Sequence, residues 1–178
     1  MARVVNVGTD ALGSGSFDPA PAGTKVKAVI FEVEETTVKS QSSPNYGQPQ
    51  IVVTAKITSD FKFQGADGTT QNLKGREVRY NNVPLYAGKA PWQLAQFAEA
   101  VGWGVDDDGN IQIPDEGEVA VNTQGREVVV TLGIRTSQDG SKKFQSVSRW
   151  APANAKVSDN AGGASGGAAP AGGGNIWN

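Results

Sequence analysis

Lysine and arginine side chains recur along several segments of this chain that alternate between polar and apolar residues, with aromatic side chains among them. In residues 51–63, IVVTAKITSDFKF, the alternation turns Lys56 and Lys62 away from the apolar face. In residues 141–152, SKKFQSVSRWAP, cations and aromatics alternate in the same way. Cations neutralise phosphates, and a base stacked on an aromatic ring contributes about 1–3 kcal/mol. The pattern predicts a groove for a single-stranded polynucleotide.

The candidate nucleic-acid-binding residues lie on four of the predicted strands. They are Lys56, Lys62, Arg76, Arg79, Tyr80, Arg135, Lys143, Phe144, Arg149 and Trp150. Arg76 and Arg79 alternate to opposite faces, so at most one of them joins a given patch. A second interpretation stays open, in which the cations form an ordinary solvated face and Phe144 and Trp150 belong to the core.

The elements that must position these residues are five predicted strands and one helix. The strands are residues 24–39, 51–63, 75–86, 125–136 and 141–152, and Val29, Phe31 and Val33 are expected on one face of the first. The helix, residues 90–103, starts at Pro91 and stops at Gly102. Its expected apolar face is Trp92, Leu94, Ala95, Ala98 and Val101. This order predicts a mainly β fold, a small five-stranded antiparallel OB-like barrel with one helix between strands three and four.

Composition narrows the classes of function. The chain has 178 residues, no Cys and no His. Disulfides, thiolate chemistry, an imidazole general base and a serine triad are therefore absent. Catalysis by carboxylates or lysines and magnesium bound by carboxylates stay open, but we expect neither an enzyme nor a bound cofactor. No apolar run approaches the ~18 residues that span a bilayer. We expect a soluble, cytoplasmic protein without a membrane partner.

An acidic segment lies between the predicted helix and the fourth strand. Six acids between residues 106 and 118 account for the sign of the formal charge, which would change from −2 to +4 without them. The run DDDGN resembles a calcium loop, but Ile111 stands where that loop needs Gly, and Gly117 where it needs an acid. We therefore predict a solvated loop and no metal site.

The two ends of the chain are rich in small residues. We predict a flexible arm over residues 1–23, the OB-like barrel over 24–152, and a disordered Gly/Ala-rich tail over 153–178. The last eighteen residues have a reach on the order of 20–25 Å. Their only adhesive groups are Ile176, Trp177 and the terminal Asn178, which we predict to bind a partner protein.

Several features of the chain belong together: a barrel body, a Gly-rich linker, a short apolar end, the run KKFQSVSRWAPA (142–153), and the segment from GREV (75–78) to the predicted helix. In these features the chain resembles the single-stranded-DNA-binding proteins of bacteria and their phages. The resemblance implies a body that coats single-stranded DNA during replication or recombination, in the host cytoplasm if the chain is phage-encoded. It also implies a tail tip that recruits replication or recombination proteins, and it is compatible with a homo-oligomer. The alternative is a structural protein of a phage virion or its assembly, without nucleic-acid binding.

Overall fold

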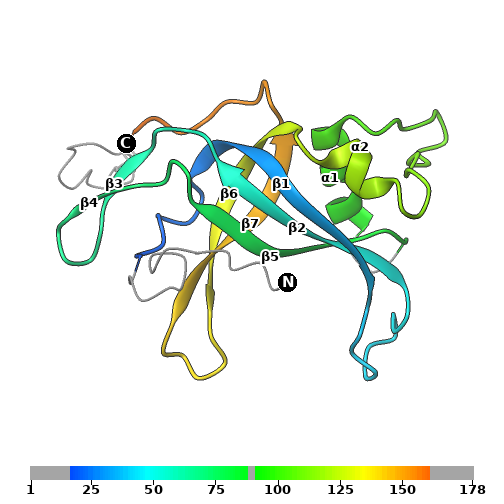
Figure 1. Cartoon of the computed structure of the whole chain (residues 1–178), viewed down its shortest axis with the longest axis horizontal. Helices are drawn as coiled ribbons and strands as arrows, with labels where there is room; N and C mark the ends of the chain where they lie inside the picture. Colours follow the sequence, from blue (N-terminus) through cyan, green and yellow to red (C-terminus); the bar gives the residue numbers. More distant parts are fainter. Residues whose placement is uncertain (1–16, 88–90, 161–178) are drawn as a thin grey trace, which may run out of the picture.

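The computed structural model describes residues 17–87 and 91–160, and only the backbone of Tyr80 and Asn81. Its elements are β1 (Lys25–Thr37), β2 (Pro49–Ile57), β3 (Lys62–Gln64), β4 (Thr70–Asn72), β5 (Glu77–Pro84), α1 (Pro91–Val101), α2 (Val119–Thr123), β6 (Glu127–Thr136) and β7 (Lys143–Pro152). Five strands form one antiparallel sheet in the order β5–β2–β1–β6–β7, and β3 pairs with β4 in a separate hairpin (Figure 1). The protein is mainly β.

The sheet curls so that its two edge strands approach each other. β5 and β7 are in contact, although no ladder joins them within the described residues. Three of the four ladders contain a β-bulge or irregularity, at Ile30/Glu32, Val53/Ala55 and Thr131/Leu132. A bulge bends the strand and increases its twist. Because no ladder joins β5 to β7 in the described residues, the barrel expected from the sequence is not closed by hydrogen bonds, and the sheet has a seam between these two strands.

The core fills the concave side of the curled sheet and is covered at one end by α1. Ile51, Val53, Ala55 and Ile57 of β2 are fully buried, as their alternation predicts. Phe97 of α1 is also fully buried. Its ring meets Trp103 and Trp150 edge to face, with centroids 5.5 and 5.2 Å away. The helix therefore closes the core against β5, β6 and β7.

Two predicted strands differ from the observed ones. The strand expected over residues 51–63 ends at Ile57, and Lys62 begins the separate hairpin. In β1, Val29, Phe31 and Val33 do not share one face, because the bulge between Ile30 and Glu32 shifts the alternation. Phe31 is 53% exposed whereas Val33 is buried. A single extra residue reverses the faces of everything that follows it.

The helical region also differs from the expectation. A second, five-residue helix, α2, follows the acidic loop. In α1 the buried residues are Leu94, Phe97, Ala98, Ala100 and Val101, and Trp92 is 51% exposed. The predicted apolar face was therefore wrong at Ala95, which is exposed, and at Trp92, which lies in the first turn, away from the core.

The tetrapeptide GREV, which occurs twice, starts a strand in the same way each time. Gly75 and Gly125 have φ of 85° and 81°, a region in which only glycine is unstrained. Gly75 donates to the carbonyl of Ile57, and Gly125 to that of Ile30. The NH of each of these isoleucines donates to the carbonyl of the following arginine, Arg76 or Arg126.

Both boundaries of the folded body lie outside the predicted range of 24–152. Ala20 is fully buried, so part of the predicted arm belongs to the core. On the other side, the Ser158 NH donates to the Lys25 carbonyl, and Asn160 Oδ1 accepts from the Lys62 NH at 3.2 Å. Residues 153–160 are thus bound to β1 and β3. No helix in the described residues is long and apolar enough to cross a bilayer.

Truncation of Phe97 tests this core. Phe97→Ala should lower the free energy of unfolding by about 3–5 kcal/mol, because it removes a fully buried ring. Trp92→Ala on the same helix should lower it by roughly 1 kcal/mol, since half of the side chain is already in water. Urea denaturation of both variants measures the difference. Equal losses would show that α1 packs through a different face.

Candidate nucleic-acid interface

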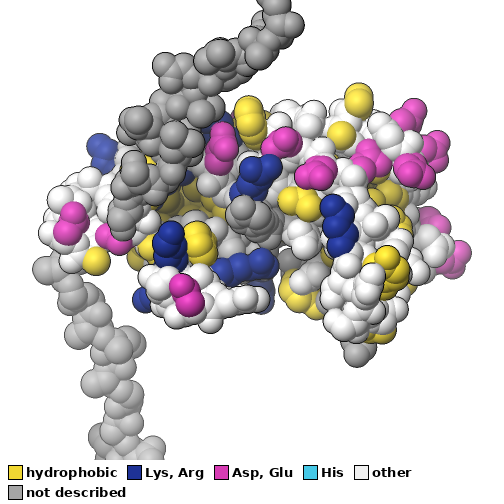
Figure 2. Space-filling model, turned by 60° about the horizontal axis from the view of Figure 1, so that its bottom comes forward, with side chains coloured by type: hydrophobic (Ala, Val, Ile, Leu, Met, Phe, Trp, Pro, Cys, Tyr) yellow, Lys and Arg dark blue, Asp and Glu magenta, His cyan; other side chains and the backbone are white. Residues whose placement is uncertain are grey.

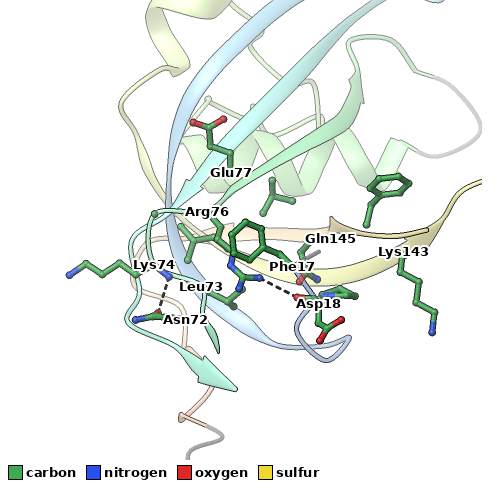
Figure 3. A pocket seen from close by; sticks show the side chains of 14 residues that line it. Phe17, Asp18, Asn72, Leu73, Lys74, Arg76, Glu77, Lys143 and Gln145 are labelled. Atoms are coloured by element: carbon green, nitrogen blue, oxygen red, sulfur yellow. Dashed lines mark hydrogen bonds between the residues drawn. The ribbon is translucent and has the colours of Figure 1, made fainter. Parts of the chain in front are cut away.

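Two hollows follow the seam between β5 and β7. The first, here the Arg76 hollow, measures about 700 Å³ and lies where both strands begin; its lining includes Phe17, Lys74, Arg76, Glu77, Lys143 and Phe144 (Figure 3). The second, here the Trp92 hollow, is a shallow depression of only about 60 Å³ that lies farther along both strands. Its lining includes Asn82, Trp92, Gln93, Gln96, Arg135, Ser148 and Trp150.

Arg76 is the best-anchored cation of the first hollow. Its guanidinium donates to the Asp18 carbonyl at 3.1 Å and to Gln71 Oε1 at 2.8 Å. The Phe17 ring centroid lies 4.6 Å from the guanidinium carbon and the Phe63 centroid 5.5 Å. Burial lowers the pKa of Arg76, and the nearby Asp18 charge opposes this effect. An arginine side chain is not deprotonated in proteins, so Arg76 is a fixed positive charge beneath the Phe17 ring.

The segment around Phe17 is tied to both sides of the hollow. Asp18 Oδ2 accepts from the Ala66 NH at 2.6 Å, in the connection between β3 and β4. The Ala20 NH donates to Gln145 Oε1 of β7 at 2.7 Å. Phe17 itself is 60% exposed, so one ring face meets Arg76 while much of the ring stays open to solvent. The segment therefore holds an aromatic platform at the mouth of the hollow.

Lys143 and Phe144 approach the same hollow from the start of β7. Phe144 is 49% exposed and Lys143 is exposed. Lys74 and Lys143 extend from opposite sides of the hollow, with Phe17 and Arg76 between them (Figure 3). Cations flanking exposed rings are the arrangement that binds phosphates and stacked bases together. Of the residues that line this hollow, Arg76, Lys143 and Phe144 were predicted from the sequence, whereas Phe17, Asp18 and Lys74 were not.

Four predicted cations lie elsewhere. Lys56 of β2 places its Nζ 5.5 Å from the Phe31 ring centroid, on the face of the sheet opposite the core. Arg79 of β5 forms an exposed ion pair with Glu32, 3.8 Å between nitrogen and oxygen. Lys62 is on the β3–β4 hairpin, and Arg149 is exposed on β7, paired in register with Thr131. These residues do not line either hollow of the seam.

Arg135 and Trp150 both line the Trp92 hollow, from β6 and β7. Trp150 packs its ring edge-on against Phe97 at an interplanar angle of 87° and contacts the core. Trp150 thus contacts the core, as the second interpretation of the sequence expects. Phe144, by contrast, is half exposed. The side chain of Tyr80 and the residues Ile176, Trp177 and Asn178 lie outside what the structure describes. Their predicted roles stay predictions.

Charge is unevenly distributed over the molecule. In Figure 2, Lys and Arg side chains surround the hollowed centre of one face, and Asp and Glu gather most densely at the end that carries α1 and α2 in Figure 1. The acidic loop is closed by its own hydrogen bonds. Asp106 accepts from the NH groups of Asp108 and Asn110, and its bonds with the Asn110 side chain and backbone lower its pKa. No group of three potential metal ligands occurs in the described part of the chain.

Comparison with known families places the chain in one of them. A family model described as "Protein of unknown function (DUF669)" matches residues 9–162. The chain belongs to the DUF669 family. No curated protein matches it. The DUF669 match covers the Phe17 segment and residues 153–160 as well as the sheet, and it ends where the Gly/Ala-rich tail begins. The two segments that the structure adds to the predicted body therefore belong to the family's domain.

Asp139 fixes the loop that presents Lys143. Its carboxylate accepts from the Ser137 hydroxyl and from the NH and hydroxyl of Ser141, and these bonds lower its pKa from 3.8 to about 2. A lowered pKa stabilises the folded loop above pH 3.8, and this contribution disappears as the pH falls through about 2. Carboxyl carbon NMR should therefore give a titration midpoint near 2, and Ser137→Ala should move it back toward 3.8. A wild-type midpoint at 3.8 would contradict the loop geometry.

Proposed function

We propose that this DUF669 protein binds single-stranded DNA along the seam between β5 and β7, with the Arg76 hollow as the principal contact. The observation that carries the proposal is that three cations, Lys74, Arg76 and Lys143, and two exposed rings, Phe17 and Phe144, line one hollow. Neither cations nor rings alone would point to nucleic acid, but phosphates and base faces need both.

The strand order supports an OB-type barrel that is only partly open. The first strand, β1, pairs with the second and fourth strands of the sheet, β2 and β6, and the third and fifth, β5 and β7, contact each other across the seam. In OB folds the ligand lies on the second and third strands between the 1–2 and 4–5 loops. The corresponding loops here, residues 38–48 and 137–142, extend as two arms from the same side of the sheet (Figure 1).

The charge of the hollow favours an anionic ligand. Its acids are Asp18 and Glu77, and the Asp18 carboxylate already accepts from the Ala66 NH and from Gln71 Nε2. Lys143 and Lys74 are exposed. An incoming phosphate would meet exposed ammonium groups and the half-buried guanidinium of Arg76, which stays charged with only part of its hydration shell. The acidic loop at the other end of the molecule would repel the same ligand and orient it toward the seam.

The exposed rings favour a single strand over a duplex. Phe17 and Phe144 present ring surface that only an unpaired base can cover, because the bases of a duplex are stacked on one another. A role in coating DNA during replication or recombination is the function that the resemblance implies, and we retain it as part of this proposal. Recruitment of a partner through Trp177 is a separate hypothesis.

Removal of one cation and one ring tests the proposal. We measure anisotropy of a labelled oligothymidylate of about 20 nucleotides, longer than the roughly 4–16 that one OB fold covers. Lys143→Ala should reduce the slope of log K against log salt by up to about 0.7, the value of one phosphate contact on a single strand. Phe144→Ala should weaken binding by about 1–3 kcal/mol with little change in that slope.

Lys27→Ala is the matched control, because Lys27 is an exposed lysine of the central strand β1 and lines neither hollow. Its affinity and salt slope should equal those of the wild type within a factor of about 2. If the wild type does not bind the oligonucleotide, or if all three variants behave alike, the seam is not a DNA-binding site. A purely structural role would then be the better explanation.

A further inference from the structure

Trp92 is an exposed indole on a helix whose other large apolar residues are buried. Leu94 and Phe97 of α1 are 7% and 0% exposed, whereas Trp92 is 51% exposed. Tryptophan is the side chain with the largest apolar surface, so leaving half of it in water forgoes much of the stabilisation that its burial would contribute. The core does not use this residue, because Phe97 already fills the space between Trp103 and Trp150.

Polar side chains from β5, α1, β6 and β7 surround Trp92. Asn82 of β5, Gln93 and Gln96 of α1, Arg135 of β6 and Ser148 of β7 line the same hollow as its indole. Amide and hydroxyl groups both donate and accept hydrogen bonds, and a guanidinium pairs with phosphate. An aromatic face beside amides and one arginine is suited to an unpaired nucleobase, which is stacked on its face and hydrogen-bonded on its edge.

The two hollows lie at successive positions on the same pair of strands. β5 contributes Glu77 and Val78 to the Arg76 hollow, and Asn82 and Val83 to the Trp92 hollow. β7 contributes residues 143–145 to the first, and Val147, Ser148 and Trp150 to the second. Each of the ladders β5–β2, β2–β1, β1–β6 and β6–β7 is antiparallel, so β5 and β7 run in the same direction. Five residues of β5 at about 3.3 Å each separate the hollows by about 17 Å.

We propose that Trp92 is a second stacking site for the same bound strand, so that single-stranded DNA runs along the seam from the Arg76 hollow to the Trp92 hollow. This inference rests on the function proposed above. At 3.4 Å per stacked nucleotide, a distance of about 17 Å corresponds to about five nucleotides. Shorter oligonucleotides reach one hollow only, and longer ones engage both.

The experiment is a length series of oligothymidylates, from about 2 to about 12 nucleotides, against full-length wild type and Trp92→Ala. The wild type should show a step in affinity where the oligonucleotide becomes long enough to reach the second hollow. Trp92→Ala should remove this step. It should weaken the longest oligonucleotides by about 5- to 150-fold, the loss of one stacked base, and leave the shortest unchanged. Trp92→Phe should keep most of the step, because phenylalanine still stacks.

Two further variants make the outcome decisive. Gln96→Glu places a negative charge in the Trp92 hollow without removing the indole, and it should weaken only the longer oligonucleotides. Val121→Ala, at an 80% exposed apolar residue of α2, should leave the whole series unchanged. Oligonucleotide binding that is equal in wild type, Trp92→Ala and Gln96→Glu at all lengths overturns the second site and leaves the proposed function standing. Absence of binding by wild type at every length overturns both.

Discussion

The architecture depends on the curl of one five-stranded sheet around its central strand. β1 pairs with β2 on one side and with β6 on the other, and irregularities in three of the four ladders bend these strands toward the core. Without that curl, β5 and β7 would be the distant edges of an open sheet and would expose unpaired NH and carbonyl groups. With it, the two edges face each other and create the seam that carries both hollows.

The seam is held at its two ends by different means. α1 covers one end, where Phe97 packs between Trp103 and Trp150. At the other end, the Phe17 segment bridges the β3–β4 hairpin and β7 through Asp18 and Ala20, with Arg76 beneath it. The apolar closure is buried, and the polar closure leaves cations and rings open to solvent. This difference explains why the Arg76 hollow is the stronger candidate for a charged ligand.

Much of the fold was predictable from the sequence, and the features that were not predicted have identifiable causes. The alternation in β2 and the turn residues located the main strands, because burial on one face imposes a period of two. The bulge in β1 was not predictable, since an extra residue leaves no trace in the composition. Trp92 was assigned to the core because helical spacing alone does not say which of two aromatic residues fills the available space. Phe17 was missed because its neighbours in sequence are small residues typical of a flexible arm, although a lone aromatic there is itself a signal.

The most direct test of the account is to map the bound strand onto the protein. Amide resonances of the ¹⁵N-labelled full-length chain can be followed while an unlabelled oligothymidylate is added. Binding along the seam should produce shifts concentrated in residues 17–20, 72–78 and 143–150 and in the first turn of α1, with little change in residues 106–118. Shifts confined to the outer face of β1 or to the acidic loop, or no shifts at a saturating oligonucleotide concentration, would contradict a binding site along the seam.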